Sequence, residues 1–254
     1  YNIMKLLLFD VDGTLTPARK TIEEPMLEQL KRLKSIDGLH VGFVGGSDLS
    51  KQIEQLGEEN FGLFDWRFSE NGLLGYFNGE KIHSQSFVDT LGEEHFQKLI
   101  NICLAVMSTL KIPKKRGTFV EYRNGMINIS PVGRACSQEE REEFEIFDNS
   151  FKVRQLMIAK IQNLWGEYIR KENLTKLPEI KYSIGGQISV DVFPKGWDKT
   201  YCLQFVEGKY DEIHFFGDKT DEGGNDYEIY SDKRVNGHHV DSFEDTVAYL
   251  KEHF

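Results

Sequence analysis

The most constraining feature of this chain is a pair of aspartates that ends a short apolar segment. Asp10 directly follows the run Met4-Lys5-Leu6-Leu7-Leu8-Phe9, and Asp12 comes two residues later. Such a run is typical of a strand buried in a parallel sheet, and open α/β sheets bind ligands at the carboxyl ends of their strands. Paired carboxylates there can hold Mg²⁺, and one of them can attack phosphorus. The motif predicts phosphoryl transfer, whereas the simpler alternative is a strand that ends in a polar Asp-Gly turn.

The run FDVDGTL over residues 9–15 resembles the first motif of the haloacid dehalogenase superfamily. The resemblance implies that Asp10 becomes an aspartyl-phosphate. It implies that Asp12 is the general acid and base, which protonates a departing sugar oxygen and deprotonates an incoming hydroxyl. It also implies that Mg²⁺ is held by the Asp10 carboxylate, the Asp12 backbone carbonyl and Asp218, which follows a predicted strand at 212–216.

Alternating strand and helix patterns at both ends of the chain predict a Rossmann-like parallel sheet. After the first strand, a capping-box pattern at 21–24 opens an apolar stripe that is typical of a helix. A strand over 39–44 and a helix from Leu49 to Leu56 follow. We expect residues 1–79 and 195–254 to form this α/β core domain.

The middle of the chain carries a different pattern. Asn78-Gly79 and Asn124-Gly125 are hairpin signals, and apolar stripes predict three helices, one of them opened by a capping box at Ser137. We therefore expect an inserted α+β cap domain, built on an antiparallel sheet, over residues 80–194. An aspartyl-phosphate needs shelter from water, so we expect this cap to open and close like a lid.

Alternation around Asn124-Gly125 predicts one polar face on the cap sheet. Glu121, Arg123, Asn128 and Ser130 share that face, and residues 187–191 repeat the scheme with Ser189 and Asp191. These polar residues can form the floor of a site for a hydroxylated ligand. The alternative is a sheet with one face wetted by solvent, which is common in antiparallel sheets.

Three further segments match phosphate chemistry in their order along the chain. Gly46 and Ser47, between a strand and a helix, can form an anion seat, or Ser47 can simply cap the helix. Lys199 can supply a fixed positive charge and matches the third superfamily motif, although alone it would be a surface lysine. Asn225 and Asp226 extend the fourth motif, or they form a plain turn.

Charge and cysteine content limit the possible partners. The formal net charge of −10 and the pI near 5.3 argue against binding to nucleic acid or to an anionic membrane. Cys103, Cys136 and Cys202 have neither zinc-site nor disulfide spacing, which favours the reducing cytoplasm. No apolar stretch approaches the roughly 20 residues that span a bilayer, and the first one is too acidic for a signal peptide. We expect a soluble cytoplasmic protein.

Motifs in both predicted domains look like those of the eukaryotic-type α-phosphomannomutase family. They are FDVDGTLTPAR, VGGSD, SENG, KKRGTFVEYRNGMINISPVGR, SQEER, GGQISVDVFPKGWDK and FFGDKTDEGGND. The resemblance implies interconversion of mannose 6-phosphate and mannose 1-phosphate, with a mannose or glucose 1,6-bisphosphate as intermediate and activator, and supply of GDP-mannose synthesis. Such a reaction needs a second, cationic phosphate seat.

The same resemblance assigns residues to that seat. It implies that Arg19 of the core and Arg123, Arg134 and Arg141 of the cap bind phosphate, and that Ser189 and Asp191 contact sugar hydroxyls. Guanidinium groups suit the phosphate at the other end of the sugar, because they stay charged and can donate two parallel hydrogen bonds to its oxygens. From spacing alone, Arg141 can instead pair with Glu145 one helical turn away.

Two more implications concern a second cation and assembly. By matching, Tyr230 and Val235 would offer carbonyl oxygens and Asp232 a carboxylate to a structural cation, and Asn225 and Asp226 of the fourth motif are further candidate metal ligands. The family also suggests a homodimer through the cap, with the helix around Trp165 and Tyr168 as the candidate face.

Two other functions remain open from the sequence. A sugar-phosphate phosphatase would use the same core and Asp10, with water as the final acceptor. A metal-dependent phosphate-binding module without turnover would not need Asp12. The choice between mannose and glucose depends on the seating of one ring hydroxyl, which the sequence does not determine.

Overall fold

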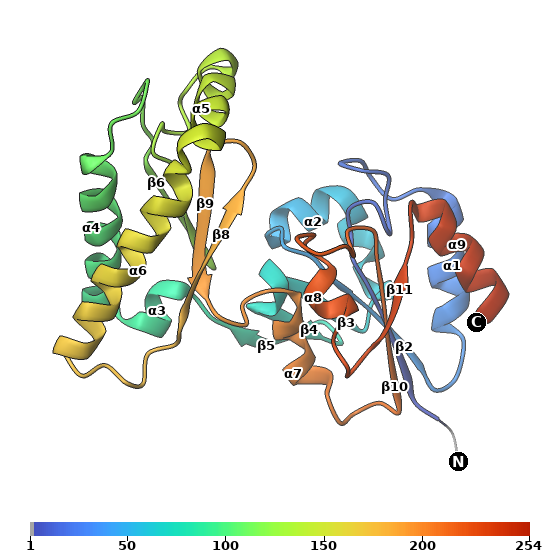
Figure 1. Cartoon of the computed structure of the whole chain (residues 1–254). Coiled ribbons are helices and arrows are strands. Elements are labelled where there is room, and N and C mark those ends of the chain that lie inside the picture. The colour runs from blue at the N-terminus through green and yellow to red at the C-terminus, as the bar shows by residue number, and fades with distance from the viewer. Residues whose placement is uncertain (1–2) are drawn as a thin grey trace. The chain divides into compact units, whose positions relative to one another are not determined.

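A computed structural model describes residues 3–254, and it divides into two compact units (Figure 1). Unit 1 comprises the chain up to Ser84 together with Gly196–Phe254, and unit 2 comprises Gln85–Lys195. Unit 1 contains a mostly parallel sheet and unit 2 an antiparallel sheet. The predicted α/β fold with an inserted antiparallel part is therefore confirmed.

The sheet of unit 1 has seven strands, with the first strand of the chain near its centre. Their spatial order is β11 (Asn236–His239), β10 (Glu212–Gly217), β1 (Lys5–Phe9), β2 (Leu39–Val44), β3 (Trp66–Ser69), β4 (Leu74–Phe77) and β5 (Glu80–Ser84). The strands from β11 to β3 pair in parallel, whereas β4 and β5 are antiparallel. Strand β1 thus has β10 and β2 as its two neighbours.

Helices cover both faces of this sheet. Alternate residues of β1 point to opposite sides, so β1 contributes side chains to the core on each face. Leu7 and Phe9 belong to the core under α1 (Glu24–Lys34) and α9 (Phe243–His253), which lie side by side in Figure 1. Leu6 and Leu8 belong to a second core with residues of the 3₁₀ helix Lys199–Cys202, of α7 (Leu203–Val206) and of α8 (Tyr227–Tyr230). Burial of β1 on both sides explains its unbroken apolar sequence.

The start of α1 differs from the expected capping box at residues 21–24. The helix begins at Glu24 with Glu23 at the N-cap, and no side chain caps it. Pro25 explains the difference, since proline is favoured in the first turn and needs no partner for its missing N–H. The other predicted capping box is confirmed, because Ser137 caps α5 together with Glu140.

The boundary between the units lies five residues later than the expected end of the first core segment. Residues 80–84, which fall in the predicted cap domain, form β5 at the edge of the unit 1 sheet, where they pair with β4. The Asn78-Gly79 signal indicates that two strands pair. It does not indicate which sheet the hairpin joins.

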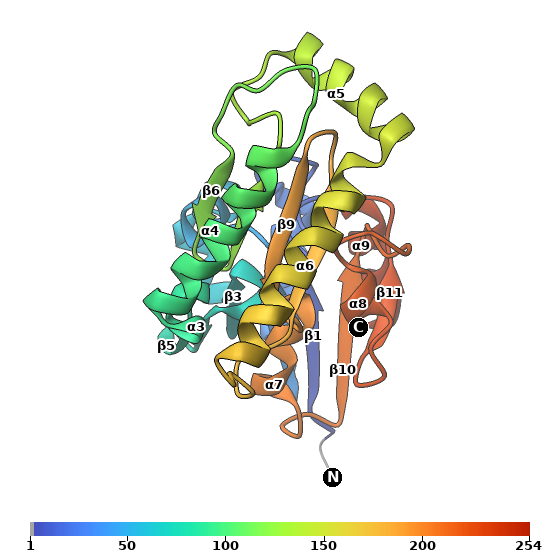
Figure 2. The same cartoon turned by 60° about the vertical axis from the view of Figure 1, so that its left-hand side comes forward.

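Unit 2 is a four-stranded antiparallel sheet with helices on one face. The strand order is β6 (Val120–Arg123), β7 (Met126–Ile129), β9 (Ser189–Pro194) and β8 (Ile180–Gly185). The helices are α3 (Phe87–Leu91), α4 (Glu93–Thr109), α5 (Gln138–Phe151) and α6 (Val153–Lys171). Figures 1 and 2 show α4 and α6 side by side along the sheet. No helix within residues 3–254 is long and apolar enough to cross a membrane.

Candidate active site

The carboxyl ends of three neighbouring strands bring the predicted core residues together. Asp10 follows β1, the segment Gly45–Ser47 follows β2, and Asp218 follows β10. These loops border a cavity of about 330 Å³, lined by Asp10, Val11, Asp12, Arg19, Gly45, Gly46, Ser47, Lys51, Gln52, Gln55 and Asn225. Parallel pairing places these ends at one edge of the sheet, as expected for ligand sites of open α/β sheets.

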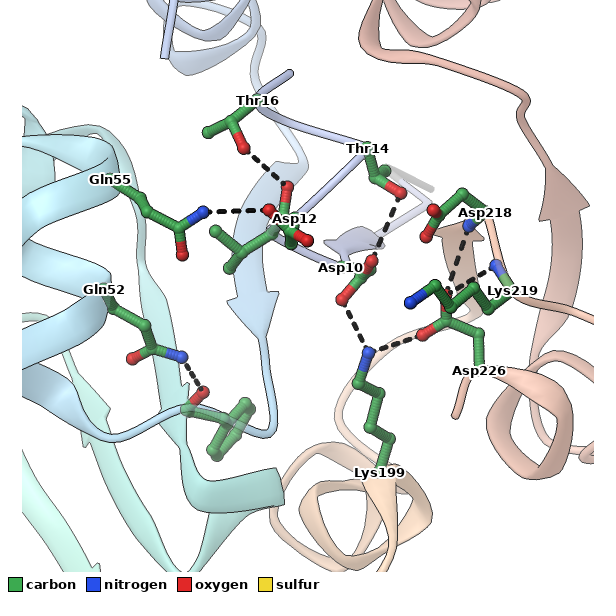
Figure 3. Close-up of polar contacts among 12 residues, drawn as sticks. Asp10, Asp12, Thr14, Thr16, Gln52, Gln55, Lys199, Asp218, Lys219 and Asp226 are labelled. Carbon is green, nitrogen blue, oxygen red and sulfur yellow. Dashed lines mark hydrogen bonds and ion pairs between the residues drawn. The ribbon is translucent and has the colours of Figure 1, made fainter. Parts of the chain in front are cut away.

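Lys199 is the charged centre of the cluster in Figure 3. Its ammonium nitrogen lies 2.6 Å from Oδ1 of Asp10 and 2.5 Å from Oδ1 of Asp226. The Lys199 side chain is 2% exposed and that of Asp226 is 0% exposed. The alternative that Lys199 is a surface lysine is therefore wrong, and Asp226 is more than part of a plain turn.

Burial and charge set the protonation of this cluster. Burial raises the pKa of Asp10 to about 7, because Lys199 offsets only part of the desolvation and Asp226 adds a like charge. Burial alone would lower the pKa of Lys199, but Asp10 and Asp226 outweigh it and raise that pKa above its ordinary value. The ammonium group therefore stays charged, while burial disfavours the ionised form of Asp10.

The acidic cluster fits a divalent cation. Oxygens of Asp10, Asp218 and Asp226 lie within 4.8 Å of one another. Oδ1 of Asp218 is buried and has no hydrogen-bond partner among residues 3–254. Three carboxylates face one ammonium group, so the ionised cluster carries two uncompensated negative charges. Oxygen ligands and this charge suit Mg²⁺.

Asp226 is occupied differently from the other two acids. Its Oδ2 accepts hydrogen bonds from the backbone N–H groups of Asp218 and Lys219, both at 3.1 Å, while Oδ1 accepts from Lys199. Both carboxylate oxygens are engaged by the protein. Asp226 therefore orders the loop after β10 and orients Lys199.

Gly13 leaves the space that Asp218 occupies. Its φ is +80°, and a Cβ added there would lie 2.5 Å from Oδ2 of Asp218. A side chain at this position would be strained and would also displace the carboxylate. The glycine of the Asp-Gly pair thus serves the site as well as the turn.

Asp12 is oriented by two donors that meet one of its oxygens. Nε2 of Gln55 donates to Oδ1 at 3.1 Å, and the backbone N–H of Arg19 donates to the same atom (Figure 3 shows the Gln55 contact). This arrangement fixes the orientation of the Asp12 carboxyl group through Oδ1. Sequence reasoning missed Gln55. The available signal was that Gln52 and Gln55 are polar residues one turn apart in the first helix after Ser47, and both are buried.

Ser47 does not cap the helix that follows it. Asp48 is the N-cap of α2 (Leu49–Leu56), and its side chain accepts a hydrogen bond from the backbone N–H of Lys51 at 2.9 Å. The simple-cap interpretation of Ser47 is therefore wrong. Gly46 and Ser47 are exposed and line the cavity, together with Lys51, which the sequence analysis did not single out.

Among the residues expected near a second cation, Asp232 already has its carboxylate engaged by the protein. Arg234 donates to both carboxylate oxygens of Asp232, from Nε at 2.9 Å and Nη2 at 2.8 Å. The backbone N–H of Val235 donates to the Asp232 carbonyl at 3.1 Å, and Tyr230 is the last residue of α8. Asn225 is exposed at the cavity edge. The second cation stays a prediction.

The polar face of the unit 2 sheet forms a connected network. Glu121 pairs with Asn128 and Asn128 with Asp191 in the strand register, as the alternation predicted for the first pair. Nη1 of Arg134 donates to Oδ1 of Asn128 at 2.9 Å and to Oγ of Ser189 at 3.2 Å. Nδ2 of Asn128 donates to Oδ1 of Asp191 at 2.8 Å. Since Asn128 and Ser189 are buried, this part of the face is not simply wetted by solvent.

The remaining predicted arginines differ in their contacts. Arg123 forms an ion pair with Glu121 at 2.8 Å, and Arg19 has an exposed side chain at the cavity edge. Arg141 is half-buried in the first turn of α5, and its guanidinium has no ion-pair or hydrogen-bond partner in the part of the chain that the structure describes. The expected alternative, pairing with Glu145, is not observed there.

The candidate dimer face stays a prediction, although one of its two named residues does not lie on the surface. Trp165 is buried inside unit 2, and the hydroxyl of Tyr168 is 2.6 Å from Nδ1 of His95. The spacing of Trp165 in the apolar stripe of α6 explains this burial. The large exposed apolar side chains of these helices include Ile146, Phe151 and Leu156. All three cysteines are free.

Comparison with known proteins identifies relatives along almost the whole chain. The model of the eukaryotic phosphomannomutase family matches residues 26–254. The phosphomannomutase of Schizosaccharomyces pombe is 55% identical over 253 residues, which cover 98% of this chain and 94% of that protein. The phosphomannomutase of Saccharomyces cerevisiae is 52% identical over 250 residues, with the same two coverages of 98% and 94%.

A solved structure supports the fold alone. Trehalose-6-phosphate phosphatase of Aspergillus fumigatus has a TM-score of 0.64 to this chain at 14% identity. The match covers 98% of this chain and 92% of that one.

Proposed function

The chain belongs to the eukaryotic phosphomannomutase family, and we propose that it interconverts D-mannose 6-phosphate and α-D-mannose 1-phosphate through a phosphorylated Asp10. Its relatives identify it as an enzyme that transfers phosphate, an isomerase. The observation that carries the mechanism is the buried 2.6 Å contact between Lys199 and Asp10, beside Oδ1 of Asp218, which has no hydrogen-bond partner among residues 3–254. A nucleophilic carboxylate in this position is shielded by positive charge on one side.

Asp10, Asp218 and the backbone carbonyl of Asp12 would hold Mg²⁺. When bound, Mg²⁺ draws charge away from the phosphoryl oxygens and lowers their repulsion of an incoming carboxylate. We assign Asp226 to a supporting position because both of its oxygens already accept hydrogen bonds.

Asp10, Asp12 and Lys199 then have separate roles in the phosphoryl transfer. A carboxylate oxygen of Asp10 attacks the phosphorus of a hexose 1,6-bisphosphate, and the bond between that phosphorus and the sugar oxygen breaks. Asp12 gives its proton to the departing oxygen. In the reverse direction, the other hydroxyl of a hexose monophosphate attacks the aspartyl-phosphate and gives its proton to Asp12. Lys199 holds Asp10 in one orientation throughout.

We propose that unit 2 acts as a cap domain that binds the sugar and its non-reacting phosphate. Arg123, Arg134 and Arg141, together with Arg19 of unit 1, supply guanidinium groups for that phosphate. Ser189 and Asp191 contact sugar hydroxyls. Arg141 supports this assignment because its charge is not neutralised by a carboxylate within residues 3–254. The product, mannose 1-phosphate, would supply GDP-mannose synthesis.

We also propose a homodimer through unit 2, by way of the exposed apolar residues at the junction of α5 and α6. Ile146 is 69% exposed and Phe151 is 61% exposed. Replacing both by serine should convert a dimer into a monomer in light scattering. A wild-type protein that is already monomeric at micromolar concentration would refute this assembly.

The decisive experiment follows phosphate from substrate to product. Purified protein, Mg²⁺, mannose 1-phosphate and a trace of glucose 1,6-bisphosphate are monitored by phosphorus NMR. We expect mannose 6-phosphate to form with little inorganic phosphate, and Asp10→Asn to lose at least about a thousandfold in rate. Asp221→Asn, which changes an exposed acid in the loop after β10, is the control and should retain full rate. Inorganic phosphate as the main product would favour a phosphatase, and an active Asp10→Asn would refute the mechanism.

A further inference from the structure

Unit 2 contains a buried ion pair that is separate from its polar face. Nε of Arg154 lies 2.7 Å from Oδ2 of Asp148, and the two side chains are 6% and 9% exposed. Asp148 lies in the last turn of α5 and Arg154 in the first turn of α6. The backbone N–H of Arg154 also donates to Oδ1 of Asp148 at 2.9 Å. The pair therefore fixes the junction of the two helices.

The other end of the guanidinium group reaches the turn between β8 and β9. Nη1 of Arg154 lies 3.2 Å from the carbonyl oxygen of Gly185, and 3.0 Å from those of Gly186 and Ser189. Gly185 and Ser189 are paired across the ladder, so these carbonyls close the turn. One buried cation thus holds three backbone acceptors in place.

This turn presents a residue of the polar face. Ser189 begins β9, and its Oγ accepts a hydrogen bond from Arg134 at 3.2 Å. Gly186 has a φ of +55°, and neither it nor Gly185 has a side chain that can hold the turn. The contacts of Arg154 supply the restraint that the two glycines lack.

We infer that Arg154 is a positioning residue for sugar binding. It acts through the turn over residues 185–189 and keeps the Ser189 hydroxyl in the network with Arg134. This inference rests on the proposed function, because it requires that Ser189 contacts the sugar. Arg154 itself touches the backbone of the turn and not the hydroxyl.

The chemistry of the pair explains why the residue is arginine. Its planar guanidinium offers donors in a fixed fork, so it can bind Asp148 and the turn carbonyls at the same time. A lysine ammonium is a compact charge on a flexible stem and cannot span both groups in this geometry. Asp148 neutralises the charge, which would otherwise be buried alone.

The test compares Arg154→Lys with a control of similar structural cost. We expect Arg154→Lys to raise KM for mannose 1-phosphate about five- to tenfold, the loss expected for one misplaced hydrogen bond, while kcat stays within about twofold. Asp148→Asn should also raise KM. If Arg154→Lys does not fold, Asp148→Asn takes its place in the comparison with the control. The control is Met157→Ala, which removes a fully buried side chain one turn further along α6. It should lower the thermal midpoint and leave KM unchanged.

The outcomes separate this inference from the function on which it rests. Ser189→Ala is measured in parallel and should raise KM by a similar factor. If Ser189→Ala leaves KM unchanged, the sugar contact is wrong and the inference falls with it. If Ser189→Ala raises KM but Arg154→Lys and Asp148→Asn do not, only the inference is overturned. An equal rise in KM for Met157→Ala would show that general loosening of unit 2 is the cause, and would also overturn it.

Discussion

Replacing Lys199 by methionine removes a buried ammonium group but keeps most of the length and volume of the side chain. Two carboxylates, those of Asp10 and Asp226, then lose their contacts at 2.6 and 2.5 Å. Breaking a buried ion pair by removing one partner costs about 3–5 kcal/mol in free energy of unfolding, since a charge is left uncompensated. For a domain of this size each kcal/mol lowers the thermal midpoint by about 2–4 °C, so the expected loss is about 6–20 °C.

The assay is thermal unfolding at neutral pH, with and without Mg²⁺, followed by activity. We expect Mg²⁺ to raise the midpoint of Lys199→Met more than that of the wild type, because the variant site carries more uncompensated negative charge. The variant should also lose at least about a hundredfold in kcat, because a preorganised charge beside the nucleophile is gone. The control is Lys195→Met, since Lys195 and Glu179 form an exposed pair at 3.3 Å that contributes less than about 1 kcal/mol.

The reasoning would be refuted by a Lys199→Met protein that unfolds, without Mg²⁺, within about 1 kcal/mol of the wild type. Such a result would mean that Asp10 and Asp226 do not depend on the ammonium group in the folded state. If Mg²⁺ raised the thermal midpoints of Lys199→Met and the wild type equally, this result would contradict the charge balance that we assign to the site.

Three other changes test separate parts of unit 1. Gly13→Ala should weaken Mg²⁺ binding at least about tenfold by calorimetry, because the new Cβ would lie 2.5 Å from the Asp218 carboxylate; unchanged affinity would contradict this packing. Gln55→Leu should lower kcat about three- to tenfold without changing KM, because one donor to Asp12 is lost; an unchanged kcat in the coupled assay would argue against the contact. Burial, with His214 and His253 nearby, lowers the pKa of His238 to about 4. The unfolded chain therefore binds this proton more tightly than the folded protein, and the free energy of unfolding falls as the pH drops from about 6.5 to 4. Urea unfolding should show a loss of about 1–2 kcal/mol that is absent in His238→Gln, a figure discounted for the half-exposed ring; the same loss in both proteins would contradict it.

Much of the fold and of the site followed from local patterns whose physical basis is simple. An apolar run that ends in two acids specifies a buried strand and a polar strand end, so Asp10 and Asp12 were predictable. The Asn124-Gly125 turn fixes the register of its hairpin, which places Glu121 opposite Asn128 as expected. Lys199 could be placed only through its order among motifs, because spacing alone does not reveal burial.

The features that sequence analysis missed depend on contacts between distant segments. Gln55 is polar, and only the approach of the loop after β1 shows that it binds Asp12. Trp165 fits an interface as well as a core in the sequence, and the packing of α6 decides between them. The assignment of β5 to unit 1 likewise depends on the edge that β4 offers to it.

The order of segments along the chain has a consequence for synthesis on the ribosome. Strand β1 lies between β2 and β10 in the sheet, yet Lys199 is 189 residues downstream of Asp10. Unit 2 is continuous and contains all four of its strands, so its partners are present together as soon as that segment has emerged. We expect unit 2 to fold during translation, before β10 has been synthesised and can pair with β1. Lys199, Asp218 and Asp226 all emerge after unit 2, so a nascent chain that stalls within unit 2 presents Asp10 without its ammonium partner and without catalytic competence.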